Sequence, residues 1–416
     1  MKRIFDLTPV AAAVALLGVP ASAGEAPPVA ASAHLQDDGL HASLSFDLSA
    51  PLSGHAREIQ QPDRIVLDMR EVDFRLSPMV GRIVAPKADA LIRAFRFGLF
   101  GPGKSRVVID LAHPACVAKV ETRRLVRNGE ASRLTLELKS CGESAFVAAA
   151  LDHAPPRVDM APAAQPTAEK LGLPVIVLDP GHGGIDGGAY GVDGAVEKTL
   201  VYAFAEALRA KLEATGRYRV VMTRIGDQYV SLEDRVAKAR AADASLFVSI
   251  HADALRETAS VSGTTIYTCS ERASDAVAQR IAERENDADR QAGDEHKAAD
   301  PGVADILYDL KRRETRANAH RFSHGLVARL SEVDAMNHNP ERSAGFVVLK
   351  APDFPSVLIE LGYLSNAKDV ANLRSTPWRD KTADAVRAAI DGYFGPSDAA
   401  PSSVTASAPA TPKSSP

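Results

Sequence analysis

Val175-Ile-Val-Leu-Asp-Pro-Gly-His-Gly-Gly184 is an apolar run that leads directly into a glycine-rich turn carrying a histidine. Two other runs share this design: Leu246-Phe-Val-Ser-Ile-His251 ends on a histidine, and Ser356-Val-Leu-Ile-Glu360 ends on a glutamate. Short apolar runs bounded by turn residues are typical of buried strands. Because open α/β sheets place functional groups at the ends of their strands, the three runs predict two imidazoles and a carboxylate at one sheet edge.

Helical patterns separate the apolar runs in the second half of the chain. The expected strands lie near residues 175–179, 218–223, 245–250, 263–268, 345–349 and 356–360. This alternation predicts an α/β domain, in which a mixed sheet has helices on both faces. Ser231 and Asn366 are expected to cap helices, and Pro377 is expected in the first turn of a helix.

A fourth functional group comes from Glu197, which begins the helical pattern 197–214. His182, Glu197 and His251 would form a His₂Glu set. Such a set leaves the fourth tetrahedral position of zinc open for water, as a hydrolytic site requires. A cysteine cage is not expected, because the chain has three widely spaced cysteines. Glu360 then remains as the carboxylate that handles protons.

Two other interpretations of these residues are weaker. The stretch Gly181-x-Gly183-x-x-Asp186 has an aspartate where a dinucleotide-binding loop needs its third glycine, and no Gly-Lys-Ser/Thr follows. His320 and His324 lie four residues apart and share one helix face, but they lack the adjacent glutamate of a His-Glu-x-x-His protease. Several basic residues nearby would also repel a cation, so we expect a solvated helix face there.

Four segments together resemble the zinc-dependent N-acetylmuramoyl-L-alanine amidases of bacterial cell-wall remodelling. They are Leu178-Asp-Pro-Gly-His-Gly-Gly184, Val196-Glu-Lys198, Ser249-Ile-His-Ala-Asp253 and Ile359-Glu-Leu-Gly-Tyr-Leu-Ser-Asn366, in that family's order. The resemblance covers residues 173–394. It implies that His182, Glu197 and His251 bind Zn²⁺ and that Glu360 is the essential glutamate. It also implies that the substrate is the amide bond between N-acetylmuramic acid and L-alanine in peptidoglycan.

The residues alone support a less specific conclusion, a zinc amide hydrolase. In such an enzyme the metal polarises the amide carbonyl and lowers the pKa of its water towards about 7. Glu360 would take the water proton and pass it to the leaving amine. Two alternatives stay open: a zinc peptidase or deacetylase that cleaves another amide, and a catalytically silent wall-binding regulator that has kept the fold.

The amino terminus has the features of a secretory signal peptide. Met1-Lys-Arg3 is followed by an apolar run from Val10 to Val19 and by Ala21-Ser-Ala23, a small-residue cleavage signal. The apolar run is too short for a stable membrane anchor, which needs about 20 residues. These features predict a periplasmic enzyme. A net charge of −4 gives no basic field that would indicate nucleic-acid binding.

The expected domain organisation follows from composition. We expect a signal peptide at 1–23, an all-β domain at 33–142, a Pro/Ala-rich linker at 143–173, the catalytic domain at 174–395 and a disordered tail at 396–416.

The all-β domain is predicted from short alternating or apolar runs near residues 40–48, 64–68, 92–98, 106–110 and 134–138. It resembles the non-catalytic β-sandwich that precedes many division-associated amidases. The resemblance implies targeting to the septum through the wall itself; a spacer without a ligand is the alternative. The sequence leaves open whether Cys116 and Cys141 form a disulfide, which would leave Cys269 as a buried free thiol.

A long insertion, 273–342, separates two expected strands of the catalytic domain and must have structure of its own. We expect helices at 273–290 and 303–333, with a polar crossing between them. Similar insertions in division-associated amidases occlude the active site until an activator protein displaces a helix. By that resemblance Glu285 is the candidate to close the zinc site, with Glu283 second. The alternative is that this charged helix is simply solvated.

Overall fold

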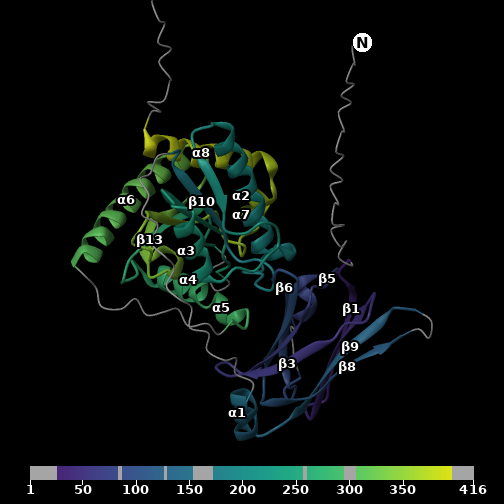
Figure 1. The fold of residues 1–416 in the computed structure, drawn as a ribbon. Helices are drawn as coiled ribbons and strands as arrows, with labels where there is room; N and C mark the ends of the chain where they lie inside the picture. Colours follow the sequence, from purple (N-terminus) through teal and green to yellow (C-terminus); the bar gives the residue numbers. More distant parts are fainter. Residues whose placement is uncertain are drawn as a thin grey trace, which may run out of the picture.

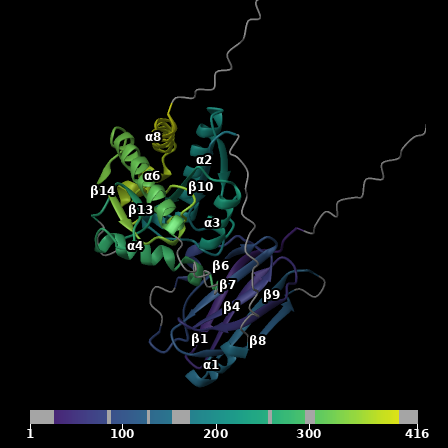
Figure 2. The ribbon, with the colours of Figure 1, turned by 60° about the vertical axis from the view of Figure 1, so that its left-hand side comes forward.

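The computed structural model describes residues 26–82, 87–125, 129–152, 172–255, 260–294 and 306–395. These residues form two units, an all-β unit and an α/β unit that meet along one side of each (Figures 1 and 2). The expected signal peptide, the expected tail and residues 153–171 of the expected linker lie outside the described residues. Among the helices that are described, none has the length and apolarity needed to cross a membrane.

The all-β unit is a sandwich, as expected, with sheet orders β5-β1-β2-β9-β8 and β3-β4-β7-β6. Its strands are β1 (Val29–Asp37), β2 (His41–Leu48), β3 (Gly54–Ile59), β4 (Arg64–Arg70), β5 (Asp73–Phe74), β6 (Ile92–Gly101), β7 (Lys104–Leu111), β8 (Ala115–Arg124) and β9 (Ser132–Ser140). Alternate residues of both sheets share one core, in which Phe46 and Phe95 pack edge to face. The first strand starts at Val29, before the expected start at Ala33. Cys116 and Cys141 are joined by a disulfide.

The expected linker is partly helical, which corrects that expectation at its start. Helix α1 (Glu143–Asp152) occupies the first residues of the segment. Its sequence is rich in alanine, the best helix former, and it buries Phe146 completely in the core of the sandwich. Burial of that ring ties residues 143–152 to the β unit.

The α/β unit holds one six-stranded sheet of order β11-β10-β12-β15-β13-β14, parallel except where β13 runs antiparallel to β15. Helices pack on both faces, which confirms the predicted fold: α2, α6, α7 and α8 share one core with the sheet, and α3 and α4 share the other. The elements are β10 (Val175–Pro180), η2 (Val192–Gly194), α2 (Glu197–Ala214), β11 (Arg219–Met222), α3 (Leu232–Ala241), β12 (Leu246–His251), β13 (Thr264–Cys269), β14 (Met336–Ala344), η4 (Val347–Leu349), β15 (Ser356–Glu360), α7 (Ala367–Arg374) and α8 (Thr376–Phe394).

The expected strand at 345–349 is wrong. Those residues include the short 3₁₀ helix η4, and the strand is the more polar segment β14 at the sheet edge. Val348 and Leu349 are buried against a core, which explains their apolar character without a strand. An edge strand needs no apolar face on its outer side and tolerates a proline such as Pro340, so the sequence of β14 lacks the apolar pattern that predicts a strand.

The insertion forms α4 (Ala276–Asn286), α5 (Ala288–Gln291) and α6 (Ile306–Ser331). The two expected helices are present, but the first is divided at Asp287 into α4 and α5, and residues 295–305 lie outside the described part. The expected caps are also present: Ser231 and Asn366 accept hydrogen bonds from the backbone of the first helical turns, and Pro377 lies in the first turn of α8.

Candidate metal centre

The turn after β10 brings His182 to the carboxyl edge of the sheet. His182 has a positive φ of 58°, which is uncommon for a residue with a side chain. Arg235 of α3 fixes the turn because it donates to the main-chain oxygens of Pro180 (3.0 Å) and His182 (2.9 Å). Its guanidinium pairs with Asp179 at 2.8 Å, and both side chains are buried. No local sequence pattern predicts Arg235 as this support, although the charged Asp179 inside the apolar strand β10 indicates a buried partner.

His182, Glu197 and His251 meet at this edge. Glu197 lies 3.1 Å from His182 Nε2 and 3.2 Å from His251 Nδ1. Both carboxylate oxygens of Glu197 also accept backbone hydrogen bonds, from Ala189 (2.8 Å) and Ala252 (2.9 Å). The second nitrogen of His182 is held by Asp186 at 2.8 Å. A carboxylate bound to the outer nitrogen of a histidine is the usual second-shell arrangement of metal-ligating imidazoles.

Two glycines permit this close packing. A Cβ added at Gly181 would lie 2.3 Å from the His251 ring, and one at Gly188 would lie 2.5 Å from His182 Cδ2. Gly188 also has a φ of +66°, where residues with a side chain are strained. The glycines of the motif therefore make room for the two imidazoles.

The charges of the cluster are strongly coupled. Burial would lower the pKa of His182, but the neighbouring Asp186, Glu197 and Glu285 carboxylates raise it well above its usual value. Burial would raise the pKa of Glu197, but His182 and His251 hold it well below its usual range. A carboxylate that stays ionised while fully buried needs a cation beside it.

Glu360 lies next to this cluster on the neighbouring strand. His251 and Glu360 are partners in the register of the parallel strands β12 and β15. Glu360 Oε2 accepts from the backbone N–H of Asp253 at 2.9 Å, whereas Oε1 has no hydrogen-bond partner among the described residues. Burial, followed by the charges of Asp253 and Glu197, raises the pKa of Glu360 well above its usual value. Such a carboxyl group is suited to accepting and releasing a proton.

Glu285 of α4 reaches the same cluster. Its Oε2 lies 3.4 Å from His182 Nε2 and 3.2 Å from His251 Nδ1. The side chain is buried, and burial raises its pKa to about 7. One ligand atom from each of His182, Glu197, His251 and Glu285 lies within 4.8 Å of all the others.

Glu283, the second candidate, is exposed and accepts from Gln279 at 2.6 Å instead. The neighbour of Glu285, Arg284, donates to the buried Asp253 and, at 2.7 Å, to the main-chain oxygen of Ala254. Helix α4 therefore contacts the site through two charged side chains.

The rival histidine pair is not part of this arrangement. His320 and His324 are both exposed on α6, and His324 lies 3.3 Å from Glu341. Neither belongs to the cluster that could hold a metal ion among the described residues. Their surroundings agree with the expected solvated helix face.

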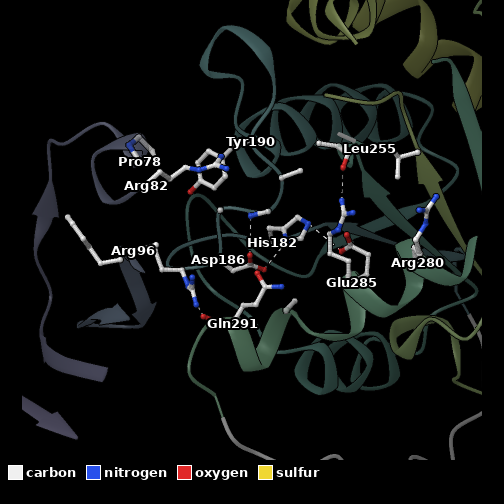
Figure 3. Close-up of a pocket in the computed structure, with 18 residues that line it drawn as sticks. Pro78, Arg82, Arg96, His182, Asp186, Tyr190, Leu255, Arg280, Glu285 and Gln291 are labelled. Atoms are coloured by element: carbon white, nitrogen blue, oxygen red, sulfur yellow. Dashed lines mark hydrogen bonds and ion pairs between the residues drawn. The ribbon is translucent and has the colours of Figure 1, made fainter. Parts of the chain in front are cut away.

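A cavity of about 490 Å³ opens beside the cluster, between the two units (Figure 3). Figure 3 shows His182, Asp186 and Glu285 on one wall, with Arg82 and Arg96 of the β unit opposite. The candidate metal centre borders this cavity through His182, and α4 lines part of it through Glu285.

A mixed α/β sheet with a buried His/Glu cluster and a carboxyl of raised pKa at its strand ends defines a candidate metallohydrolase. The model of the N-acetylmuramoyl-L-alanine amidase family matches residues 176–392. The N-acetylmuramoyl-L-alanine amidase AmiC of Neisseria meningitidis serogroup B is 31% identical over 409 residues, which cover 95% of each chain. AmiC of Escherichia coli O6:H1 is 31% identical over 81% of this chain and 82% of its own. AmiA of Escherichia coli K12 is 37% identical over 55% of this chain and 80% of its own.

The chain belongs to the N-acetylmuramoyl-L-alanine amidase family. It is an enzyme that hydrolyses the amide bond between N-acetylmuramic acid and L-alanine in peptidoglycan. The candidate metal centre lies within the matched residues.

Proposed function

We propose that the hydrolysis depends on Zn²⁺ held by His182, Glu197 and His251. The observation that carries this proposal is the convergence of these ligand atoms, with one from Glu285, within 4.8 Å of one another. The side chains fit the metal: His182 Nε2 is buried without a hydrogen-bond partner in the described part of the chain, and it faces two carboxylates. Two imidazoles and one carboxylate are a common ligand set of catalytic zinc.

Bound zinc would supply Lewis-acid polarisation of the amide and an acidified water. Glu360 then accepts the proton of the attacking water and returns it to the leaving amine of L-alanine. Its backbone hydrogen bond through Oε2 orients the group and leaves Oε1 available for the proton. A pKa above the usual carboxyl value makes the Glu360 carboxylate a stronger proton acceptor than an ordinary glutamate.

We also propose that α4 inhibits the resting enzyme. Glu285 Oε2 lies 3.4 Å from His182 Nε2 and 3.2 Å from His251 Nδ1, where it would complete the zinc ligands and exclude water and substrate. An activator protein that withdraws α4 would restore activity. The separate ligand roles rest on geometry: Glu197 lies on a helix packed on the sheet, whereas Glu285 lies on the insertion.

The biological setting follows from the same proposal. The enzyme acts in the periplasm after removal of a signal peptide at 1–23, and the β-sandwich at 33–142 directs it to the wall during daughter-cell separation. The catalytic domain corresponds to residues 174–395. The support is the coverage of both units by the match to the AmiC of Neisseria meningitidis.

The direct test is digestion of purified peptidoglycan by the purified full chain and by its Glu285→Ala variant, in which the proposed inhibition is removed, with mass analysis of the fragments and metal analysis of both proteins. We expect new L-alanine amino termini, intact lactyl ethers and one zinc per chain. New termini elsewhere in the stem would indicate a peptidase, loss of acetyl groups a deacetylase, and absence of both zinc and products a silent wall-binding regulator.

A further inference from the structure

The β-sandwich contacts the metal-site loop through the end of β6. The N–H of Ile185, three residues after His182, donates to Leu99 O at 3.0 Å. Gly98 lies so close to Gly184 that a Cβ at Gly98 would come within 2.6 Å of the Gly184 backbone. The two units are therefore in main-chain contact beside the candidate metal centre.

Three arginines of the same sheet contact the end of α5. Arg96 Nε donates to Gln291 O at 2.7 Å, Arg106 Nη1 donates to Gly293 O at 2.7 Å, and Arg64 Nη1 donates to Arg290 O. Arg290 O also accepts from the N–H of Gly293 at 3.0 Å, and carbonyl groups at a helix end can accept the guanidinium donors because they lack partners within the helix. Figure 3 shows Arg96 beside Gln291 at the floor of the cavity. We call Arg64, Arg96 and Arg106 the arginine clasp.

The clasp is held in position by carboxylates of its own sheet. Asp110 pairs with Arg96 through two contacts, at 2.8 and 3.0 Å, and with Arg64 at 3.0 Å. Asp68 pairs with Arg106 through contacts of 2.5 and 2.9 Å. Bidentate pairs fix the plane of a guanidinium, so the remaining N–H groups already point at α5.

Apolar packing joins the polar contacts. Ala292 is fully buried in a small cluster with Val66 and Val108 of the sandwich and Tyr229 of the α/β unit. A Cβ at Gly293 would lie 2.8 Å from Val66 Cγ2, so the chain after α5 passes directly over the sheet. The sandwich thus covers the end of the segment that carries Glu285.

We propose that the β-sandwich is a part of the inhibitory device, because its arginine clasp holds the α4–α5 segment over the metal site. This inference rests on the proposed role of Glu285. By linkage, anything that pulls the sandwich away from the catalytic unit favours release of α4, and anything that displaces α4 weakens the docking of the sandwich. Wall binding by the sandwich and activator binding to α4 would then act on one equilibrium.

The α/β unit also holds this segment. Asp289 accepts from Tyr229 at 2.8 Å and from the N–H of Leu232 at 3.0 Å. Asn286 donates to Gly345 O at 2.9 Å and accepts from Val347 at 2.8 Å. Loss of the clasp therefore loosens the segment without freeing it completely, and the expected activation is partial.

The test compares the full-length variants Arg96→Met and Arg96→Met/Arg106→Met with wild type, by hydrogen exchange of the backbone amides of 276–291. Loss of one charge-assisted hydrogen bond should speed exchange of these amides on the order of tenfold, and the double variant should exceed the single one. Basal hydrolysis of purified peptidoglycan should rise in the same order. Arg93→Met is the matched control, because Arg93 is an exposed arginine on the same strand as Arg96.

Exchange in β2 and β9 reports whether the sandwich stays folded. The single variant keeps Asp110 paired with Arg64, so it remains informative if the double variant unfolds. Unchanged exchange of 276–291 in a folded Arg96→Met protein would overturn the clasp. Glu285→Ala, measured in parallel, separates the two proposals. If the arginine variants exchange faster but no variant, Glu285→Ala included, is more active, the clasp holds the segment and Glu285 does not inhibit. If Glu285→Ala is more active but exchange in the arginine variants is unchanged, Glu285 inhibits and the clasp does not hold the segment.

Discussion

Two glutamates approach the same pair of histidines from different regions of the molecule. Glu197 comes from α2, is fully buried, accepts two backbone hydrogen bonds and has a lowered pKa. Glu285 comes from the insertion, and burial raises its pKa to about 7. The fold stabilises the Glu197 carboxylate in its charged form, whereas the charged form of Glu285 depends on a bound cation. Preorganised backbone donors around Glu197 suit a permanent ligand. In the described part of the chain no backbone N–H donates to the Glu285 carboxylate, which suits a reversible ligand.

The largest effect is expected when one of the permanent metal ligands is removed. Replacing His182, Glu197 or His251 by alanine should abolish zinc retention and activity together, because each supplies one of the three ligands proposed to hold the metal whether or not Glu285 is in place. Metal analysis after desalting and digestion of purified wall measure both. A variant that keeps one zinc per chain with full activity would remove its residue from the ligand set.

Glu360→Gln separates proton transfer from metal binding. We expect full zinc content and a fall in turnover of roughly 10²–10⁴-fold, since an amide cannot take the proton from water. A conservative change at the exposed Glu341 is the control. Loss of zinc in Glu360→Gln would mean that Glu360 is a ligand.

Removal of Glu285, the reversible ligand, should raise activity, whereas removal of a permanent ligand should abolish it. Glu285→Ala, or deletion of residues 273–290, should raise basal wall hydrolysis without any partner, on the order of tenfold or more if closure dominates the resting state. Glu283→Ala is the matched control, because Glu283 is exposed on the same helix. Equal basal activity in zinc-loaded, folded Glu285→Ala would argue against inhibition by this side chain.

The smallest expected effect concerns pH in the metal-free protein. Burial raises the pKa of Glu285 from 4.5 to about 7 in the closed state. The proton is thus bound more tightly when α4 is closed, so this contribution to closure is full below pH 4.5 and is lost as pH rises through about 7. Amides of α4 should exchange faster at pH 8 than at pH 6 after correction for intrinsic rates.

Glu285→Gln should remove that part of the pH dependence. Added zinc should oppose it, since a cation favours the carboxylate. A metal-free wild type with the same pH response as Glu285→Gln would show that Glu285 does not titrate in this range.

Sequence patterns predicted the strands and helices whose limits are set by local signals. The strands ending at His251 and Glu360 and the helix beginning at Glu197 have the predicted limits, because apolar runs and helix starts are local signals. The strand β14 was missed because an edge strand needs no apolar pattern. The Asp179–Arg235 pair and the arginine clasp were missed because they join residues far apart in sequence, which no local pattern encodes.

The arginine clasp donates its hydrogen bonds to the main-chain oxygens of residues 290, 291 and 293 and not to their side chains. Residues 290 and 291 can therefore change in the course of evolution without loss of these contacts, whereas Ala292 and Gly293 must stay small under Val66. Among related amidases that share this arrangement, selection should fall on the arginines, on Asp68 and Asp110, and on two small residues after α5. An alignment would then show a constrained surface on the sandwich that faces a variable helix end, a pattern easily mistaken for a binding site for the wall.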